Sequence, residues 1–166
     1  HPMEVVSVAA TMTDDPALLA AAALHDTLET CPSLTAEAIE KTFGAHVADL
    51  VSFETEIADP ETGWRERRQA ALDRLKGADE EQLILALSDR LSDARALSRE
   101  YAALKDELWQ RFNQADRREQ AWYYKALVVA FKPLERFGAY GEFKHLISSV
   151  FARRRAAKSA PEENNG

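Results

Sequence analysis

Three features of the sequence could bind a metal ion: His1-Pro2, the pair His25-Asp26, and Asp89. His25 and Asp26 end an apolar stretch that should be buried, where an unpaired carboxylate is costly and needs a cation or hydrogen-bond donors nearby. Two imidazoles and two carboxylates are harder ligands than the thiolates of structural zinc sites, and they suit manganese, iron, zinc or magnesium with open water positions. Because such an ion activates water, the pattern predicts hydrolytic chemistry.

Glu29 is the candidate general base or acid. It follows Asp26 by three residues, which is close to one helical turn, so both side chains should lie on the same face. From there a carboxylate could orient or deprotonate the attacking water. The alternative is a surface charge at the end of a helix.

A cluster of arginines could bind phosphate. Arg65, Arg67 and Arg68 follow an expected loop at 59–63, and a guanidinium offers a fork of donors that matches phosphoryl oxygens. The same residues could instead form a solvated face paired with Glu61 and Glu66. Both interpretations remain open at this point.

Composition narrows the partners and the compartment. The net charge of −7 argues against a polynucleotide ligand, because nucleic-acid binders usually present a basic face. The only cysteine, Cys31, excludes an internal disulfide and fits a reducing compartment, and no apolar run approaches the roughly 20 residues that cross a bilayer. We therefore expect a cytoplasmic protein with a small ligand and no membrane partner. The first residue is histidine, so we expect the chain to be part of a longer one. The sequence predicts no oligomeric state.

The elements that must position these residues are all helical. No segment shows the alternation of a strand, whereas helix starts and stops recur along the chain, and 166 residues suit one all-α domain. Thr13-Asp-Asp-Pro16 predicts a capped start for the helix that carries His25. Helices are expected at about 2–12, 16–30, 35–43, 45–55, 64–75, 80–101, 104–112, 117–137 and 141–151. We expect a domain over 1–152 and a disordered tail over 153–166.

Four blocks of the sequence occur together in one known family. They are His1-Pro2, AAALHDTLET at 21–30, LTAEAIEKTFGAHVADLV at 34–51 and LSDRLSDAR at 87–95. In this order and spacing they resemble the RelA/SpoT-type HD hydrolases, over residues 1 to 95. The chain looks like one of the small stand-alone members, which lack the synthetase domain.

The resemblance implies a fold, a metal and a reaction. The fold is the all-helical HD fold, and one divalent ion, usually Mn²⁺, would be held by His1, His25, Asp26 and Asp89. The reaction would be removal of the 3′-pyrophosphate from guanosine tetra- or pentaphosphate, (p)ppGpp, by a metal-activated water. Arg95 falls in the block that the family uses for nucleotide contact, so it joins Arg65 and Arg68 as a candidate substrate-binding residue.

Two positions depart from the family pattern. Thr30 stands where the family usually has an aspartate next to the glutamate, so a second proton carrier at this catalytic position is missing. Asp93 stands where an asparagine usually contacts the nucleotide, and its charge should disfavour an anionic ligand unless a cation neutralises it.

Because of these two departures, other functions remain possible alternatives. The same metal-dependent chemistry could act on another phosphoester, such as the 2′-phosphate of NADPH, an activity that the resemblance to animal members implies. A second possibility is a module that binds or senses a nucleotide with little turnover. A partner-docking scaffold is a third, although surface recognition would not require four metal ligands.

Overall fold

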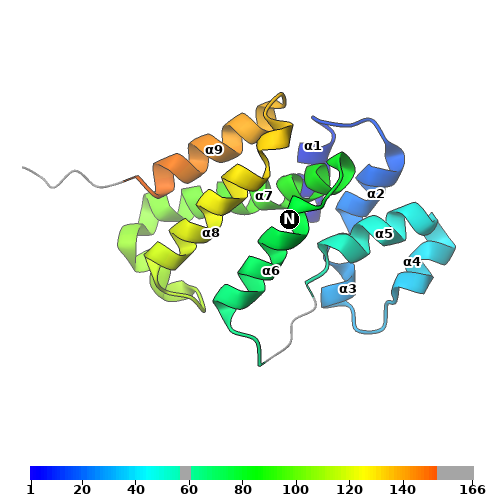
Figure 1. The fold of residues 1–166 in the computed structure, drawn as a ribbon, viewed down its shortest axis with the longest axis horizontal. Helices are drawn as coiled ribbons and strands as arrows, with labels where there is room; N and C mark the ends of the chain where they lie inside the picture. The colour runs from blue at the N-terminus through cyan, green and yellow to red at the C-terminus, as the bar shows by residue number, and fades with distance from the viewer. Residues whose placement is uncertain (57–60, 153–166) are drawn as a thin grey trace, which may run out of the picture.

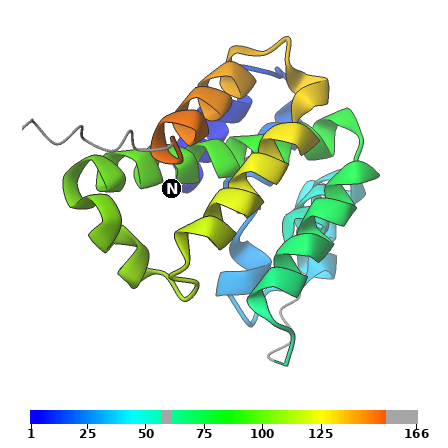
Figure 2. The same cartoon turned by 60° about the vertical axis from the view of Figure 1, so that its left-hand side comes forward.

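The fold is organised around one long helix, α7 (Glu80–Leu104), which crosses the molecule in both views (Figures 1 and 2). The computed structural model describes residues 1–56 and 61–152, and this part of the chain contains helices and turns but no strand. The prediction of an all-helical single domain is confirmed. The other helices are α1 (Pro2–Ala9), α2 (Pro16–Leu24), α3 (Thr27–Thr30), α4 (Ala36–Phe43), α5 (Ala45–Glu54), α6 (Trp64–Lys76), α8 (Arg117–Ala130) and α9 (Gly138–Val150), with 3₁₀ turns η1 (Lys105–Arg111) and η2 (Lys132–Leu134).

Side-chain caps fix the starts of the helices that carry the candidate site. Both carboxylate oxygens of Asp15 accept hydrogen bonds from the first turn of α2, as the Asp-Pro sequence predicts. At α7, Asp79 accepts from the Gln82 backbone N–H, and the Gln82 side chain accepts from the Asp79 backbone N–H in return. These caps satisfy donors that the first turn of a helix otherwise leaves unpaired.

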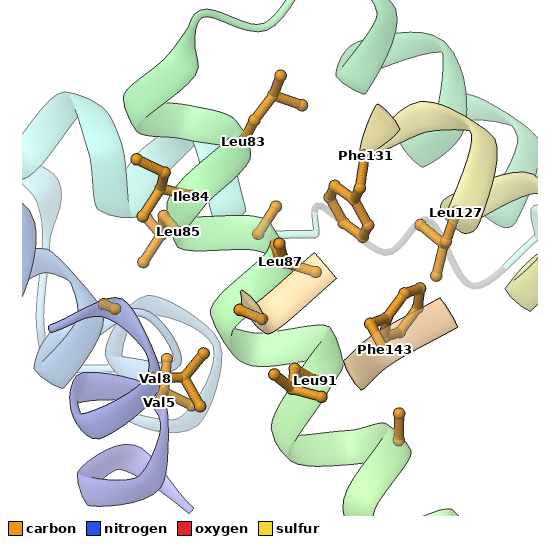
Figure 3. Close-up of a cluster of buried hydrophobic side chains, with 14 of the residues drawn as sticks. Val5, Val8, Leu83, Ile84, Leu85, Leu87, Leu91, Leu127, Phe131 and Phe143 are labelled. Atoms are coloured by element: carbon orange, nitrogen blue, oxygen red, sulfur yellow. The ribbon is translucent and has the colours of Figure 1, made fainter. Parts of the chain in front are cut away.

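One stretch of α7, from Leu83 to Asp89, is buried on all sides. Every residue from Leu83 to Asp89 is buried, because α1, α2 and α5 pack on part of α7 and α9 packs on another part. Figure 3 shows Val5 and Val8 of α1 on one side of Leu87 and Leu91, and Phe143 of α9 on the other. A polar side chain on this stretch must therefore find its partners inside the protein.

Three expected helices differ from the observed ones in kind or continuity, whereas the ends of the others lie within three residues of the expected bounds. The predicted helix over 16–30 is broken at His25 and Asp26, which form a turn between α2 and α3. The predicted α-helix over 104–112 is the 3₁₀ segment η1, which begins at Lys105, a residue with a positive φ of 53°. The predicted helix over 117–137 ends at Ala130, and η2 follows because Pro133 has no backbone N–H to continue the ladder.

Two expectations fall partly or wholly outside the described residues. They are the loop at 59–63, of which 59 and 60 are not described, and the tail at 153–166. Among the described helices, none combines the length and the apolar character needed to cross a bilayer.

Candidate metal centre

His1, His25, Asp26 and Asp89 come together at one point in the fold, and we call them the ligand cluster. Asp89 Oδ1 lies 2.9 Å from His1 Nε2 and 3.4 Å from His25 Nε2. Asp26 Oδ2 lies 3.2 Å from His25 Nε2 and 3.8 Å from His1 Nε2, and the two imidazole nitrogens are 3.3 Å apart. Each of the four side chains thus directs a nitrogen or oxygen atom to the same small volume.

The four members come from three structural positions. His1 directly precedes α1, His25 and Asp26 occupy the turn between α2 and α3, and Asp89 lies in the middle of α7. The turn is held by the Thr27 hydroxyl, which donates a 2.6 Å hydrogen bond to the Leu24 carbonyl. The cluster therefore forms only where the two N-terminal helices pack on α7.

The far nitrogen of each imidazole is also bonded. His25 Nδ1 lies 2.9 Å from the Ala22 carbonyl and must donate to it, which leaves Nε2 as the ligand atom. His1 Nδ1 lies 3.0 Å from the hydroxyl of Ser92. Such partners fix ring orientation and are typical of metal-binding histidines.

The charges of Asp89 and Arg90 shift the pKa values of the residues around them. Burial opposes ionisation of Asp89, but the Arg90 charge and the hydrogen bonds from His1 and His25 hold the pKa of Asp89 well below its usual range. Burial would lower the pKa of His25, yet its bond to Asp89 and the charge of Asp89 raise that pKa to about 9. The bond to Asp89 also raises the pKa of His1. The ionised Asp89 thus favours positive charge on the imidazoles, at the positions where a cation would also be favourable.

The donor set fits a divalent cation. It combines two imidazole nitrogens with two carboxylate oxygens, a mixture that suits manganese, iron or zinc. His25 and Asp89 are only 1% and 5% exposed at the side chain, whereas His1 and Asp26 are 35% and 43% exposed. One side of the cluster is therefore rigid and buried, and the other is open to a substrate, as in catalytic metal sites.

A second group with metal-ligand chemistry, Asp15, His46 and Glu81, is a weaker candidate. Both oxygens of Asp15 already accept backbone N–H groups, and His46 pairs with Glu81 at 3.1 Å. All three residues lie at helix N-termini, where the helix dipoles disfavour a cation.

A polar cavity of about 270 Å³ lies beside the ligand cluster, and we call it the arginine cavity. Asp93, whose carboxylate can share a site with His1 and Asp89, is part of its wall. Three arginines and several aromatic rings face it. The lining residues are Glu56, Trp64, Arg67, Arg68, Arg90, Asp93, Phe112, Asn113, Gln114, Gln120, Tyr123 and Tyr124.

The predicted substrate-binding residues divide between this cavity and other surfaces. Arg68 and Asp93 line it. Arg65 does not, because its guanidinium lies over the Trp122 ring and bonds Glu119. Arg95 lines a different cavity, where it makes two hydrogen bonds of 2.7 and 2.8 Å to Glu142. These contacts favour structural roles for Arg65 and Arg95, and their binding roles remain predictions.

The two predicted catalytic residues, Glu29 and Thr30, are both exposed. Glu29 accepts a hydrogen bond from the backbone N–H of Glu56, which places it next to a residue of the arginine cavity. The hydroxyl of Thr30 donates to the Asp26 carbonyl at 2.8 Å, so it stabilises the turn that carries a ligand-cluster residue. The catalytic roles of both remain predictions.

Two residues that sequence reasoning did not single out join the site. Arg90 bonds the second oxygen of Asp89 and faces the arginine cavity. Glu54 is buried against Arg90. A signal for Arg90 was present, because it is a charged residue next to Asp89 in a helix whose pattern predicts burial.

Comparison with known proteins gives a family and a fold. A family model described as the HD domain matches residues 1–120. The crystal structure of lmo0812 from Listeria monocytogenes EGD-e superimposes with a TM-score of 0.81 at 24% sequence identity, covering 92% of this chain and 99% of that one. At this identity the likeness concerns the fold. The comparison with curated proteins found no match.

The ligand cluster makes a prediction about metal content. Protein prepared with Mn²⁺ should retain the ion, and Asp26→Ala or Asp89→Asn should lose it, because each change removes a charged ligand while leaving most of the core packing in place. Elemental analysis after gel filtration measures this, with circular dichroism to confirm folding. Asp14→Ala, which removes an exposed acid, is the control. Unchanged metal in both ligand variants would refute the assignment.

The raised pKa of His25 makes a second prediction, about pH. Since that pKa is about 9, metal-free His25 is protonated at neutral pH, and metal binding must displace the proton. The affinity for Mn²⁺ should therefore rise from pH 6 to pH 8, by about tenfold per pH unit for each displaced proton. Calorimetric titrations in two buffers of different ionisation enthalpy would measure the released protons. A pH-independent affinity would contradict this account.

Proposed function

The chain belongs to the HD domain family, and from this premise we propose that residues 1–152 form a manganese-dependent phosphohydrolase of the RelA/SpoT type. Its substrate is a small phosphorylated nucleotide, and the reaction is removal of the 3′-pyrophosphate from (p)ppGpp. HD domains are metal-dependent phosphohydrolases, so the reaction class follows from the family. The manganese ion and the substrate are the parts that we propose.

One observation carries the proposal: the ligand cluster lies beside a cavity that combines arginines with aromatic rings. Arg67, Arg68 and Arg90 are the donors that phosphate groups require, and they outnumber the carboxylates of the same cavity, Glu56 and Asp93. An acidic protein with a local excess of arginine suits a small anionic ligand. The ligand cluster and the arginine cavity meet at Asp93 and Arg90.

Different side chains would bind the metal ion, the phosphate groups and the base. When bound, a divalent ion supplies a Lewis acid that activates water and stabilises negative charge on phosphoryl oxygens. Arg68 is held in place for phosphate binding, because it pairs with Glu56 at 2.8 Å and lies 5.1 Å from the Tyr123 ring centroid. The rings of Phe112 and Tyr124 offer apolar faces on which a nucleotide base can stack.

Proton transfer is assigned to Glu29. It is a carboxylate next to the Glu56 wall of the arginine cavity, and it can exchange its backbone hydrogen bond for one to substrate or water. A positioned general acid or base contributes about 10²–10⁴ in rate. Thr30 offers only a hydroxyl, already donated to Asp26, so we expect slow hydrolysis of guanosine nucleotides.

Asp93 favours a second candidate function. Its carboxylate lies in the wall of the cavity that would receive the nucleotide, where it repels phosphate and can accept hydrogen bonds from sugar hydroxyls. A substrate that places a ribose next to Asp93 would therefore be preferred. NADPH is one such substrate, and its 2′-phosphate would be the group removed. A nucleotide sensor with little turnover would use the same residues.

Product analysis distinguishes these functions. Manganese-loaded protein is incubated with guanosine tetraphosphate and, separately, with NADPH, and released pyrophosphate and phosphate are measured over a range of Mn²⁺ concentrations. Our proposal predicts manganese-dependent pyrophosphate from guanosine tetraphosphate. Phosphate from NADPH alone would favour the second candidate, and tight binding of either nucleotide without product would favour the sensor.

Two arginines on α6 give a matched test of the arginine cavity. Arg68→Ala should raise KM for the best substrate about ten- to hundredfold, since hydrogen bonds to charged groups contribute about 1.5–3 kcal/mol. Arg65→Ala removes the same charge from a position outside the cavity, where the arginine pairs with Glu119, and should change KM less than twofold. Equal effects of the two substitutions in steady-state kinetics would show that phosphate is not bound here.

A further inference from the structure

A buried acid, Glu54, lies behind the ligand cluster. It is the last residue of α5, and its side chain is only 7% exposed. Its Oε1 lies 3.2 Å from Nη2 of Arg90 on the neighbouring helix α7. A carboxylate at this depth requires such a partner, because an unpaired buried charge is strongly unfavourable.

Arg90 connects Glu54 to the ligand cluster. Its Nη1 donates to Oδ2 of Asp89, the oxygen other than the one that faces His1 and His25. The same guanidinium faces the arginine cavity, with Nη1 3.9 Å from Asp93 Oδ2. Arg90 thus has a carboxylate behind it, the metal ligand beside it and the substrate cavity in front.

We propose that Glu54 is a positioning residue that acts through Arg90, resting on the proposed function in that Asp89 binds the metal. Glu54 holds one edge of the guanidinium, which keeps the other edge on Asp89 Oδ2 and leaves Oδ1 directed at the ion. Glu54 also neutralises part of the positive charge of Arg90, which without Glu54 would be paired with Asp89 and Asp93 alone. Glu54 therefore strengthens Asp89 as a ligand.

The energetics of Glu54 agree with a positioning role. Burial raises the pKa of Glu54 to about 7, despite the lowering effect of Arg90. A carboxyl whose pKa is raised on folding favours the fold fully only below its unfolded pKa, and this contribution is lost as the pH rises through 7. Ionised Glu54 thus lowers the stability of the fold at and above neutral pH. Its position beside Arg90 is explained instead by a role at the ligand cluster.

The test is a double-mutant cycle on metal affinity, measured from free Mn²⁺ by electron paramagnetic resonance. Glu54→Gln should weaken Mn²⁺ binding about tenfold, within the range seen when the partner of a metal ligand is removed. Arg90→Met should also weaken it. If Glu54 acts through Arg90, adding Glu54→Gln to Arg90→Met should change the affinity less than twofold.

Controls separate positioning from packing. Glu142→Gln removes one of the two carboxylate partners of Arg95, another arginine of α7, and should leave Mn²⁺ affinity unchanged. The double variant removes both charges from the core and should fold, since buried ion pairs can be replaced without loss of stability. If Glu54→Gln alone does not fold, Glu54→Asp, which shortens the reach to Arg90, gives the same comparison.

Two results would overturn the inference while leaving the proposed function intact. One is a lowered melting temperature of Glu54→Gln with unchanged Mn²⁺ affinity, which is the signature of a structural role. The other is the same loss of affinity with and without Arg90. Wild-type protein that binds no Mn²⁺ would instead refute the proposed function and this inference together.

Discussion

The buried charge of Asp89 is the constraint on which the arrangement of the site depends. Asp89 lies on the stretch of α7 that is buried on all sides, where an ionised carboxylate costs several kcal/mol unless it is paired. Its two oxygens are paired on opposite sides, Oδ1 with the two imidazoles and Oδ2 with Arg90. The buried charge of Asp89 therefore requires partners that only the packing of α1 and α2 against α7 can supply. The same packing creates the candidate cation site.

Local sequence signals predicted most of the helices and singled out His25 and Asp26, and the resemblance to a family joined them with His1 and Asp89 in one predicted metal site. Proline and aspartate at helix starts, and a His-Asp pair at the end of an apolar stretch, act over a few residues. Helical geometry explains why Arg95 lies away from Asp93 in the structure. At roughly 100° per residue, a position four residues on returns to nearly the same face and one six residues on does not. Asp93 thus shares the face of Asp89, and Arg95 points elsewhere.

What the sequence could not predict depends on contacts between distant segments. The arginine cavity is lined by residues near 56, 64–68, 90–93 and 112–124, and no local pattern indicates that these segments meet. The partner of Glu54 is equally non-local. The end of α8 was missed for a different reason, because Phe131 continues the apolar pattern of a helix while Pro133, two residues later, prevents its continuation.

The separation of 88 residues between His1 and Asp89 has a consequence for the order of folding. Closing so long a loop lowers the entropy of the chain before stabilising contacts form. Topologies with distant contacts therefore fold slowly. During synthesis, the first two helices and the turn after them leave the ribosome with three of the four predicted ligands, His1, His25 and Asp26, long before α7 exists. The predicted ion site therefore stays incomplete until α7 has been synthesised, and the contact between His1 and Asp89 can form only after that point.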